Sequence, residues 1–218
     1  MKTALLFGAT GLVGGHVLNQ LIQNDNYSKI KIFVRSSIQI NNSKIEVIQT
    51  DFKNLENHRE EIKGDDCFFC IGTTKKNSPD KNEYKRIELE LPKQVAQIAK
   101  SNLINSFVFV SSGYADPKSS GNYLKFKGLV EEELKRLNFS KLGIMRPSFL
   151  LGNRQENRVG EKIGIFIFKL LSPLFLGPLK KMKPIHSTTV AKAMIAITQN
   201  NHSKIIFESN EISEIINY

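Results

Sequence analysis

The sequence predicts an α/β fold, a doubly wound parallel sheet with a small C-terminal lobe. In the first two thirds of the chain, short apolar runs alternate with longer amphipathic stretches, which is the pattern of βαβ units. The apolar runs are almost continuously hydrophobic, as expected for strands that helices cover on both faces. No internal repeat or low-complexity linker divides the 218 residues, so we expect a single domain over residues 1–218.

The expected elements follow from the spacing of the apolar residues. The strands are predicted at Thr3–Phe7, Lys29–Val34, Ile45–Gln49, Cys67–Ile71, Phe107–Ser111 and Leu142–Arg146, with a last short strand at Lys204–Phe207. The helices are predicted at Leu12–Gln23, roughly Lys81–Ser101, Tyr123–Leu137 and Ser187–Thr198. The stretch 152–184 is both basic and hydrophobic and departs from the alternation. We predict that it is an insertion on the substrate side of the sheet; a surface helix pair that closes the core is the alternative.

Composition excludes several classes of protein. Apolar residues make up 40% and charged residues 24% of the chain, which excludes a disordered or collagen-like chain and a small disulfide scaffold. The two cysteines cannot form a disulfide framework, so we expect a reducing compartment. Residues 3–24 carry no Asp, Glu, Lys or Arg, but glycine, asparagine and glutamine interrupt their apolar residues, so an integral membrane protein is not expected. The short apolar N-terminus runs into a glycine-rich stretch and is therefore interpreted as structure, which together predicts a cytoplasmic protein.

The formal net charge of +10 is concentrated in one part of the chain. Between Lys135 and Lys192 there are twelve basic and two acidic residues, whereas the remainder is balanced. A nucleic-acid-binding surface would interleave aromatic side chains with this charge, but the aromatics here lie in apolar runs such as Ile165–Phe168. We therefore expect no nucleic-acid partner. An acidic protein or a lipid surface stays open as a partner, and the chain is expected to be a monomer or a homodimer.

A glycine-rich motif, Gly8-Ala9-Thr10-Gly11-Leu12-Val13-Gly14, follows the first predicted strand directly and opens the first predicted helix. In this setting the first glycine permits a tight turn, the second lets the backbone approach a pyrophosphate, and the third allows close packing of helix on strand. The positive end of the helix dipole then faces the phosphates. We predict a dinucleotide site whose first residues are Gly8, Thr10, Gly11, Leu12, Val13 and Gly14.

The residue after the second strand indicates which dinucleotide is bound. A fold that prefers NAD(H) would place an acidic residue there to accept hydrogen bonds from the ribose hydroxyls. This chain has Arg35, followed by Ser36, and a guanidinium pairs with a 2′-phosphate instead. We therefore predict NADP(H), with NAD(H) less favoured. Asp51 and Phe52, after the third strand, are expected to meet the adenine, and the small residues after the fourth strand are expected to admit the cofactor: Gly72, Thr73 and Thr74.

A second constellation predicts proton-transfer chemistry. A tyrosine phenol becomes a useful acid near neutral pH only if a cation stabilises its phenolate, and a lysine four residues later lies on the same helix face. Tyr123 and Lys127 have this spacing, and so do Tyr27–Lys31 and Tyr114–Lys118. Context selects Tyr123, because it alone opens a predicted helix after a strand that ends in serines. We predict Ser112, Tyr123 and Lys127 as the catalytic residues, with Tyr123 and Lys127 also binding the cofactor.

No metal site is predicted. Cys67 and Cys70 have the C-x-x-C spacing, but both lie in a predicted strand, where alternation points them to opposite faces of the sheet. We expect the two cysteines to be core or cofactor-lining residues. The four histidines show no metal-ligand spacing with carboxylates or cysteines.

These motifs resemble the extended or atypical branch of the short-chain dehydrogenase/reductase superfamily, which carries the GxxGxxG of Gly8, Gly11 and Gly14 and a Ser/Tyr/Lys triad. More narrowly, the chain is similar to the Tat-interactive-protein oxidoreductase family (CC3-like). The stretches that carry this similarity are 69–74, 123–128, 145–151, 153–158 and 160–161.

The resemblance implies a Rossmann-like fold, NADP(H) binding and oxidoreductase activity on a carbonyl or alcohol substrate. It also implies that Pro147 and Ser148 lie against the nicotinamide. Relatives often carry Asp or Asn in the fourth helix where this chain has Ile87-Glu88, so no fourth catalytic residue is identified. Two alternatives stay open: a nucleotide-sugar epimerase or dehydratase, and a regulatory protein that senses NADP without turnover.

Overall fold

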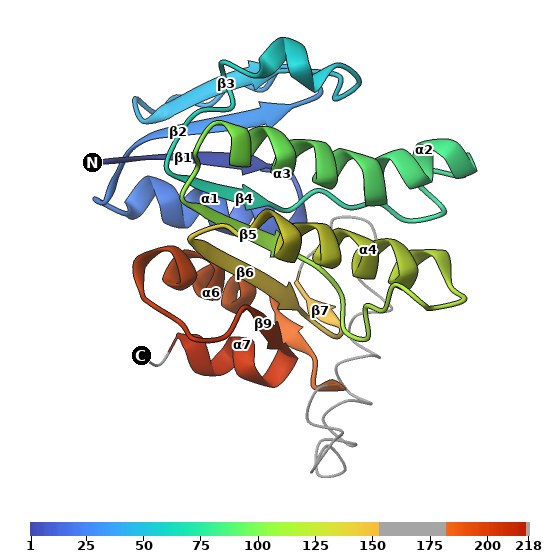
Figure 1. Cartoon of the computed structure of the whole chain (residues 1–218). Helices are drawn as coiled ribbons and strands as arrows, with labels where there is room; N and C mark the ends of the chain where they lie inside the picture. Colours follow the sequence, from blue (N-terminus) through green and yellow to red (C-terminus); the bar gives the residue numbers. More distant parts are fainter. Residues whose placement is uncertain (153–181, 217–218) are drawn as a thin grey trace.

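In the described part of the chain, seven parallel strands form the main sheet, in the spatial order β3-β2-β1-β4-β5-β6-β9 (Figure 1). The structure is a computed structural model that describes residues 1–152 and 182–216. The strands of this sheet are β1 (Lys2–Phe7), β2 (Tyr27–Val34), β3 (Ile45–Gln49), β4 (Asp66–Phe69), β5 (Ser106–Val110), β6 (Lys141–Arg146) and β9 (Ile206–Glu208). A separate parallel pair consists of β7 (Leu150–Leu151) and β8 (Ile185–His186).

Helices cover both faces of the sheet (Figure 1). The α-helices are α1 (Leu12–Gln23), α2 (Lys81–Lys85), α3 (Leu91–Ser101), α4 (Asn122–Leu137), α6 (Ser187–Gln199) and α7 (Ser209–Ile215). A short 3₁₀ helix, η1, spans Leu55–His58, and a π-helical turn, η2, spans Arg86–Glu90 between α2 and α3. This arrangement confirms the predicted doubly wound, Rossmann-like α/β fold.

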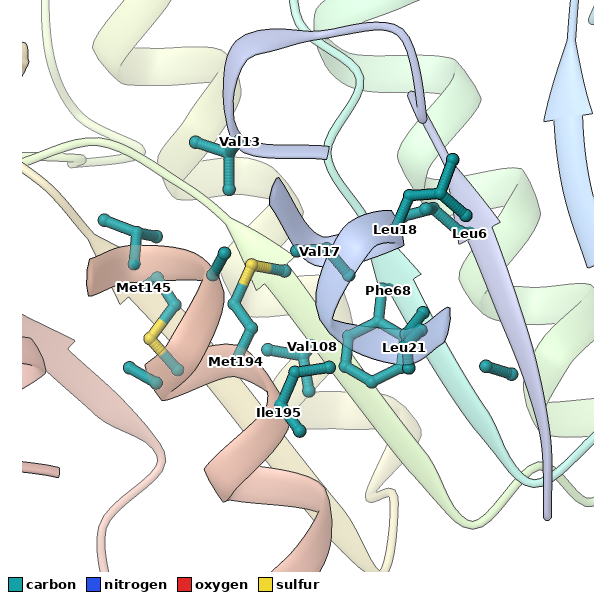
Figure 2. Close-up of a cluster of buried hydrophobic side chains, with 14 of the residues drawn as sticks. Leu6, Val13, Val17, Leu18, Leu21, Phe68, Val108, Met145, Met194 and Ile195 are labelled. Carbon is teal, nitrogen blue, oxygen red and sulfur yellow. The ribbon is translucent and has the colours of Figure 1, made fainter. Parts of the chain in front are cut away.

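Two hydrophobic clusters, one on each face, make up the core. The first lies between the sheet and α1 and α6, where Val17 and Leu21 of α1 meet Phe68 of β4 and Met194 of α6 (Figure 2). The second lies between the sheet and α3 and α4, and stacked rings such as Phe7 and Phe33, with centroids 4.3 Å apart, contribute to it. Because the strands supply side chains to both clusters, most strand residues are apolar.

The strand order reverses between β1 and β4. From β1 the chain moves outward to β2 and β3, and then crosses back to place β4 on the other side of β1. Leu5 of β1 is paired with Lys31 of β2 and with Cys67 of β4. In parallel α/β sheets, ligands bind in the crevice at the carboxyl ends of the strands at such a reversal. The residues that follow β1 and β4 therefore define the place to look for a site.

Several boundaries differ from those expected. β2 begins at Tyr27, two residues before the expected strand at Lys29–Val34, and β4 ends at Phe69, two residues earlier than expected. The expected helix over 81–101 is helical throughout, but η2 interrupts its α-helical hydrogen bonding. The elements β7, β8, η1 and α7 were not expected from periodicity. The predicted insertion over 152–184 falls mostly on residues outside those described.

The helices in residues 1–152 and 182–216 are all too short or too polar to cross a bilayer.

Candidate functional site

The glycine turn after β1 brings the start of α1 against the end of β4. Gly8 has φ +93°, and a Cβ at this position would lie 2.8 Å from the carbonyl carbon of Cys70. At Gly14, a Cβ would lie 2.0 Å from the Gly8 carbonyl oxygen. The Gly11 N–H donates to that same oxygen at 3.0 Å. The lack of side chains at Gly8 and Gly14 therefore lets the start of α1 pack closely on the ends of β1 and β4. A helix N-terminus placed in this way fits a group that contacts backbone amides, as a pyrophosphate does.

A cleft of about 950 Å³ opens over this turn, at the reversal of strand order. Its lining comes from the glycine turn and α1, the ends of β2 and β4, and the segment from α2 to α3. The lining residues are Gly8, Ala9, Thr10, Gly11, Leu12, Gly15, His16, Leu18, Asn19, Phe33, Val34, Arg35, Phe52, Cys70, Ile71, Gly72, Thr73, Asn77, Ser78, Arg86, Ile87 and Leu91. This volume is in the range that small-molecule and cofactor sites occupy.

Two guanidinium groups line one end of the cleft. Arg35 follows β2 directly and is exposed. Arg86, in η2, donates to both carboxylate oxygens of Glu83 at 2.7 Å and to the Phe52 carbonyl at 2.9 Å. The hydrogen bond from Arg86 lowers the pKa of Glu83, and the charge of Arg35 adds a smaller effect in the same direction. This end of the cleft is therefore suited to an anionic group.

Phe52 forms an apolar wall beside these charges. Its backbone is in the left-handed region, with φ 59°, and its N–H donates to Thr50 Oγ1 at 3.1 Å. The ring is buried, and its centroid lies 6.5 Å from that of Phe7. The position of Phe52 is suited to contact with a flat ring in the cleft. Asp51, by contrast, is exposed, and its carboxylate accepts the Lys53 N–H at 2.8 Å.

Some of the predicted cofactor residues lie outside the cleft lining. Gly8, Thr10, Gly11, Leu12, Arg35, Phe52, Gly72 and Thr73 line it, whereas Val13, Gly14, Ser36, Asp51, Thr74, Tyr123, Lys127, Pro147 and Ser148 do not. Val13 is packed in the core, and Gly14 acts by letting α1 approach β1. Thr74 caps a turn, since its carbonyl accepts the Ser78 N–H at 2.9 Å. These three residues support the site without facing the cleft.

Tyr123 and Lys127 lie one turn apart at the start of α4, and they differ sharply in exposure. The Tyr123 side chain reaches solvent, being 39% exposed, whereas Lys127 is only 3% exposed. The Lys127 ammonium lies 6.0 Å from the centroid of the Tyr123 ring and 4.9 Å from that of Phe109 in β5. It also donates to the Val110 carbonyl at 3.4 Å. The structure thus brings a buried cation to the base of an accessible phenol.

A carboxylate that sequence reasoning missed completes the surroundings of Lys127. Glu88, in η2, is 1% exposed, and its Oε2 lies 3.1 Å from Lys127 Nζ. The other oxygen, Oε1, accepts the Thr73 N–H at 2.5 Å. Glu88 therefore joins the lysine to the loop after β4 that lines the cleft. Pro92 is a local irregularity nearby, because it has no N–H to donate to the Glu88 carbonyl four residues earlier, but it indicates nothing about the direction of the carboxylate.

The two serines after β5 have different environments. Ser111 is buried, and its hydroxyl donates to Glu131 Oε1 at 2.5 Å. Glu131 also receives two hydrogen bonds from Arg146, at 2.9 and 2.5 Å. Ser112 is less buried, and its hydroxyl contacts only the Gly113 carbonyl, at 3.3 Å, among the described residues. Ser111 is thus held in a structural network, and the Ser112 hydroxyl has room to turn toward a ligand.

The segment after β6 is tied to the C-terminal part of the chain. Ser148 donates to the Lys183 carbonyl at 2.7 Å, and Ser209 donates to the same carbonyl at 2.6 Å. The Pro147 carbonyl accepts the Gly113 N–H at 2.9 Å, which places Pro147 beside the loop that carries Ser112. The residues expected near the nicotinamide are therefore next to the predicted catalytic serine.

Cys67 and Cys70 are separated by the sheet. Cys67 belongs to the cluster under α3 and α4, whereas Cys70 packs against the cluster under α1 and α6 and lines the cleft. Both thiols are free, and burial raises the pKa of Cys70 to about 12, so it is a neutral group. Within the described ranges no three His, Cys, Asp or Glu side chains gather as metal ligands would.

Comparison with known proteins places the chain among nucleotide-binding proteins. The NAD(P)H-binding family profile matches residues 8–201. Protein HTATIP2 of Rattus norvegicus is 32% identical over 166 residues, which are 73% of this chain and 67% of that protein. Protein FMP52-1, mitochondrial, of Scheffersomyces stipitis is 29% identical over 228 residues, which are 98% of each chain.

Solved structures show the same fold at low sequence identity. The UDP-N-acetylglucosamine 4-epimerase of Methanobrevibacter ruminantium superposes with a TM-score of 0.70 at 16% identity, covering 94% of this chain and 75% of that one. The PhqB reductase domain of Penicillium fellutanum superposes with a TM-score of 0.66 at 17% identity, covering 94% of this chain and 65% of that one.

The comparisons also correct one prediction. The expectation of a cytoplasmic location is wrong, because several relatives, from Scheffersomyces stipitis, Emericella nidulans, Eremothecium gossypii and Debaryomyces hansenii, are named as mitochondrial proteins. The few cysteines and the glycine-rich N-terminus do not distinguish one reducing compartment from another. The predicted resemblance to the Tat-interactive-protein oxidoreductases is confirmed by the HTATIP2 and FMP52 relatives. With its profile match spanning most of the sequence, the chain belongs to the NAD(P)H-binding family.

Proposed function

We propose that this protein is an NADP(H)-dependent oxidoreductase that interconverts a carbonyl compound and its alcohol. The observation that carries the proposal is the pairing of an accessible phenol with a buried ammonium. Tyr123 is 39% exposed, and the Lys127 ammonium lies 6.0 Å from its ring centroid. Both follow a strand that ends beside the glycine-lined cleft. A cation held in this way favours the phenolate form of a tyrosine, which proton transfer to or from a substrate requires.

The chain's own residues handle the proton and the orientation of the substrate. When bound, the nicotinamide supplies or accepts the hydride. Tyr123 Oη donates a proton to the carbonyl oxygen in reduction and takes it back in oxidation. The Lys127 ammonium offsets the negative charge that is left on Oη, because this ammonium is buried and water screens its charge less than it screens a surface charge. Ser112 Oγ holds the carbonyl oxygen from the other side.

The cofactor would lie in the cleft with its phosphates on the glycine turn. The turn and the N-terminus of α1 would bind the pyrophosphate, and Phe52 would contact the adenine. Arg35, with Ser36 beside it, would bind a 2′-phosphate, which supports NADP(H) over NAD(H). The remaining predicted contacts, which are Asp51, Gly72, Thr73, Thr74, Pro147 and Ser148, belong to the same proposal.

Two measurements test the function. Calorimetric titration is expected to show NADPH binding more tightly than NADH. A panel of aldehydes, ketones and quinones, followed by NADPH absorbance, is expected to contain at least one compound that consumes NADPH. An epimerase would return its cofactor unchanged and give no net consumption, and a sensor would bind NADPH without any turnover. Failure of NADPH to bind would refute the proposal.

A further inference from the structure

In the proposed function Lys127 serves both the Tyr123 phenol and the bound cofactor, and the described residues show what holds its ammonium. Its ammonium has three N–H donors. Val110 takes one of them through its carbonyl, at 3.4 Å, and the carboxylate of Glu88 lies 3.1 Å away on another side. Among residues 1–152 and 182–216, Glu88 is the carboxylate within ion-pair distance of this ammonium. The contact with Glu88 is an ion pair without a hydrogen bond, so the ammonium keeps N–H donors for a ligand on the side of Tyr123.

Glu88 is itself fixed by the backbone of the cleft. Its Oε1 accepts the Thr73 N–H at 2.5 Å, and Thr73 lines the cleft. A Cβ on the neighbouring Gly72 would lie 3.4 Å from this same oxygen, so the loop packs closely on the carboxylate. The Glu88 carboxylate is therefore held at Oε1 by an amide of the cleft and paired at Oε2 with the lysine of α4, as an ion pair without a hydrogen bond.

The π-helical turn gives Glu88 its direction. Arg86 and Ile87 of η2 line the cleft, while Glu88, the next residue, is buried against Lys127. Pro92 removes an N–H from the helical ladder directly after η2, and π turns inserted in helices are frequent at functional sites. Taking the two charges of a buried carboxylate–lysine pair out of water costs free energy that the ion pair need not recover, so stability alone does not account for this pair.

We propose that Glu88 is a positioning residue for cofactor binding, an inference that rests on the proposed function. Glu88 holds the Lys127 ammonium in place and connects it to the cleft through the Thr73 N–H. The coupling predicts a specific pattern. Loss of the Glu88 charge matters for NADPH affinity only while Lys127 is present, because Glu88 acts through that lysine. A carboxylate with a merely structural role would have the same effect on affinity whether or not the lysine were there.

A double-mutant cycle on NADPH affinity tests this coupling. Glu88→Gln, Lys127→Met and the double variant are compared with the wild type by calorimetric titration. We expect Glu88→Gln to weaken NADPH binding by about tenfold in the wild-type background, and to leave the affinity of Lys127→Met unchanged. Glu133→Gln is the matched control. Glu133 is a buried carboxylate like Glu88, but it lies in α4 and pairs with Gln97 and Arg136. Its NADPH affinity is expected to equal that of the wild type.

The outcomes separate this inference from the proposed function. If the wild type does not bind NADPH, the proposed function fails. If it binds NADPH but Glu88→Gln has equal effects in both backgrounds, the positioning role of Glu88 is overturned and the proposed function stands. Should Glu88→Gln not fold, Glu88→Asp replaces it in the cycle: its carboxylate is kept, but one methylene shorter it cannot reach Thr73 and Lys127 together. Glu88→Asp is expected to weaken NADPH binding in the wild-type background and not in the Lys127→Met background. Equal effects in both backgrounds would overturn the positioning role of Glu88.

Discussion

Replacing Gly14 by alanine tests how closely α1 approaches the turn after β1. The new Cβ would lie 2.0 Å from the Gly8 carbonyl oxygen and 2.7 Å from its carbon, whereas real Cβ atoms essentially never come within 3.0 Å. Both neighbouring atoms belong to the backbone, so no side-chain rotation relieves the contact. The start of α1 would have to move outward by about 1 Å, against the core packing of Val13 and Val17.

The magnitude follows from two opposing effects. Overpacking of this kind lowers the free energy of unfolding by up to about 3 kcal/mol, and the higher helix propensity of alanine relative to glycine raises it by up to about 1 kcal/mol. The net loss of about 2 kcal/mol lowers the Tm of a chain of this size by about 4–8 °C. The displaced α1 would also carry its first N–H groups away from the phosphates, so NADPH affinity is expected to fall.

The next residue supplies the control. A Cβ at Gly15 would lie 3.5 Å from the Ala9 carbonyl oxygen, an ordinary contact. Gly15→Ala therefore gains about 0.5–1 kcal/mol of helix propensity without a clash, and its Tm is expected to rise by about 1–4 °C. Thermal unfolding followed by circular dichroism compares the two variants. A Tm for Gly14→Ala at or above that of Gly15→Ala would show that α1 does not pack on the turn as described.

The other predictions concern the cofactor, the proton and the buried tyrosine. Arg35→Asp is expected to reverse the preference for NADPH over NADH in calorimetric titration, because a carboxylate repels a 2′-phosphate and accepts ribose hydroxyls; equal wild-type affinities for the two cofactors would contradict this. Tyr123→Phe is expected to reduce turnover of any accepted substrate by about 10²–10⁴-fold, with exposed Tyr114→Phe as the control. An unchanged rate for Tyr123→Phe would remove Tyr123 from the mechanism. Burial and the charge of Asp66 raise the pKa of Tyr27 far above its ordinary value of about 10. The contribution of Tyr27 to the free energy of unfolding is therefore complete below about pH 10, and it falls above that pH by up to about 1.4 kcal/mol per pH unit. Urea unfolding midpoints at alkaline pH are expected to fall less steeply for Tyr27→Phe, and an equal slope would contradict this linkage.

The strands and the glycine turn could be predicted because their signals are local. The run of apolar residues from Ala4 to Phe7 and the glycines that follow it specify a buried strand and a tight turn within a few residues. The position of Tyr27, by contrast, depends on residues far away in sequence. Its hydroxyl donates to Asp66 at 2.8 Å and contacts Thr198 at 2.9 Å, and these partners lie 39 and 171 residues away in sequence. The residues next to Tyr27 in the sequence do not indicate that β2 begins there.

The fourth member of the candidate site was missed for the same reason. Periodicity predicts a helix over 81–101, and the structure is helical there, but a π turn at Arg86–Glu90 rotates Glu88 toward Lys127. The ion pair between Glu88 and Lys127 joins two helical segments that are 39 residues apart in sequence, so the spacing of apolar residues does not indicate it. The strands β7 and β8 have two residues each, too few for any alternation to be seen.

The packing of α1 against α6 has a consequence for how the chain folds during synthesis. α1 leaves the ribosome well before α6, which covers its apolar face (Figure 2). Tyr27 and Thr198, which hydrogen-bond in the finished protein, are 171 residues apart, and at bacterial or eukaryotic rates of synthesis this distance takes about 9–34 s to translate. For that time Val17 and Leu21 lack their native cover. The nascent chain is therefore expected to depend on chaperones that bind exposed apolar helices, and to complete this packing only when α6 emerges.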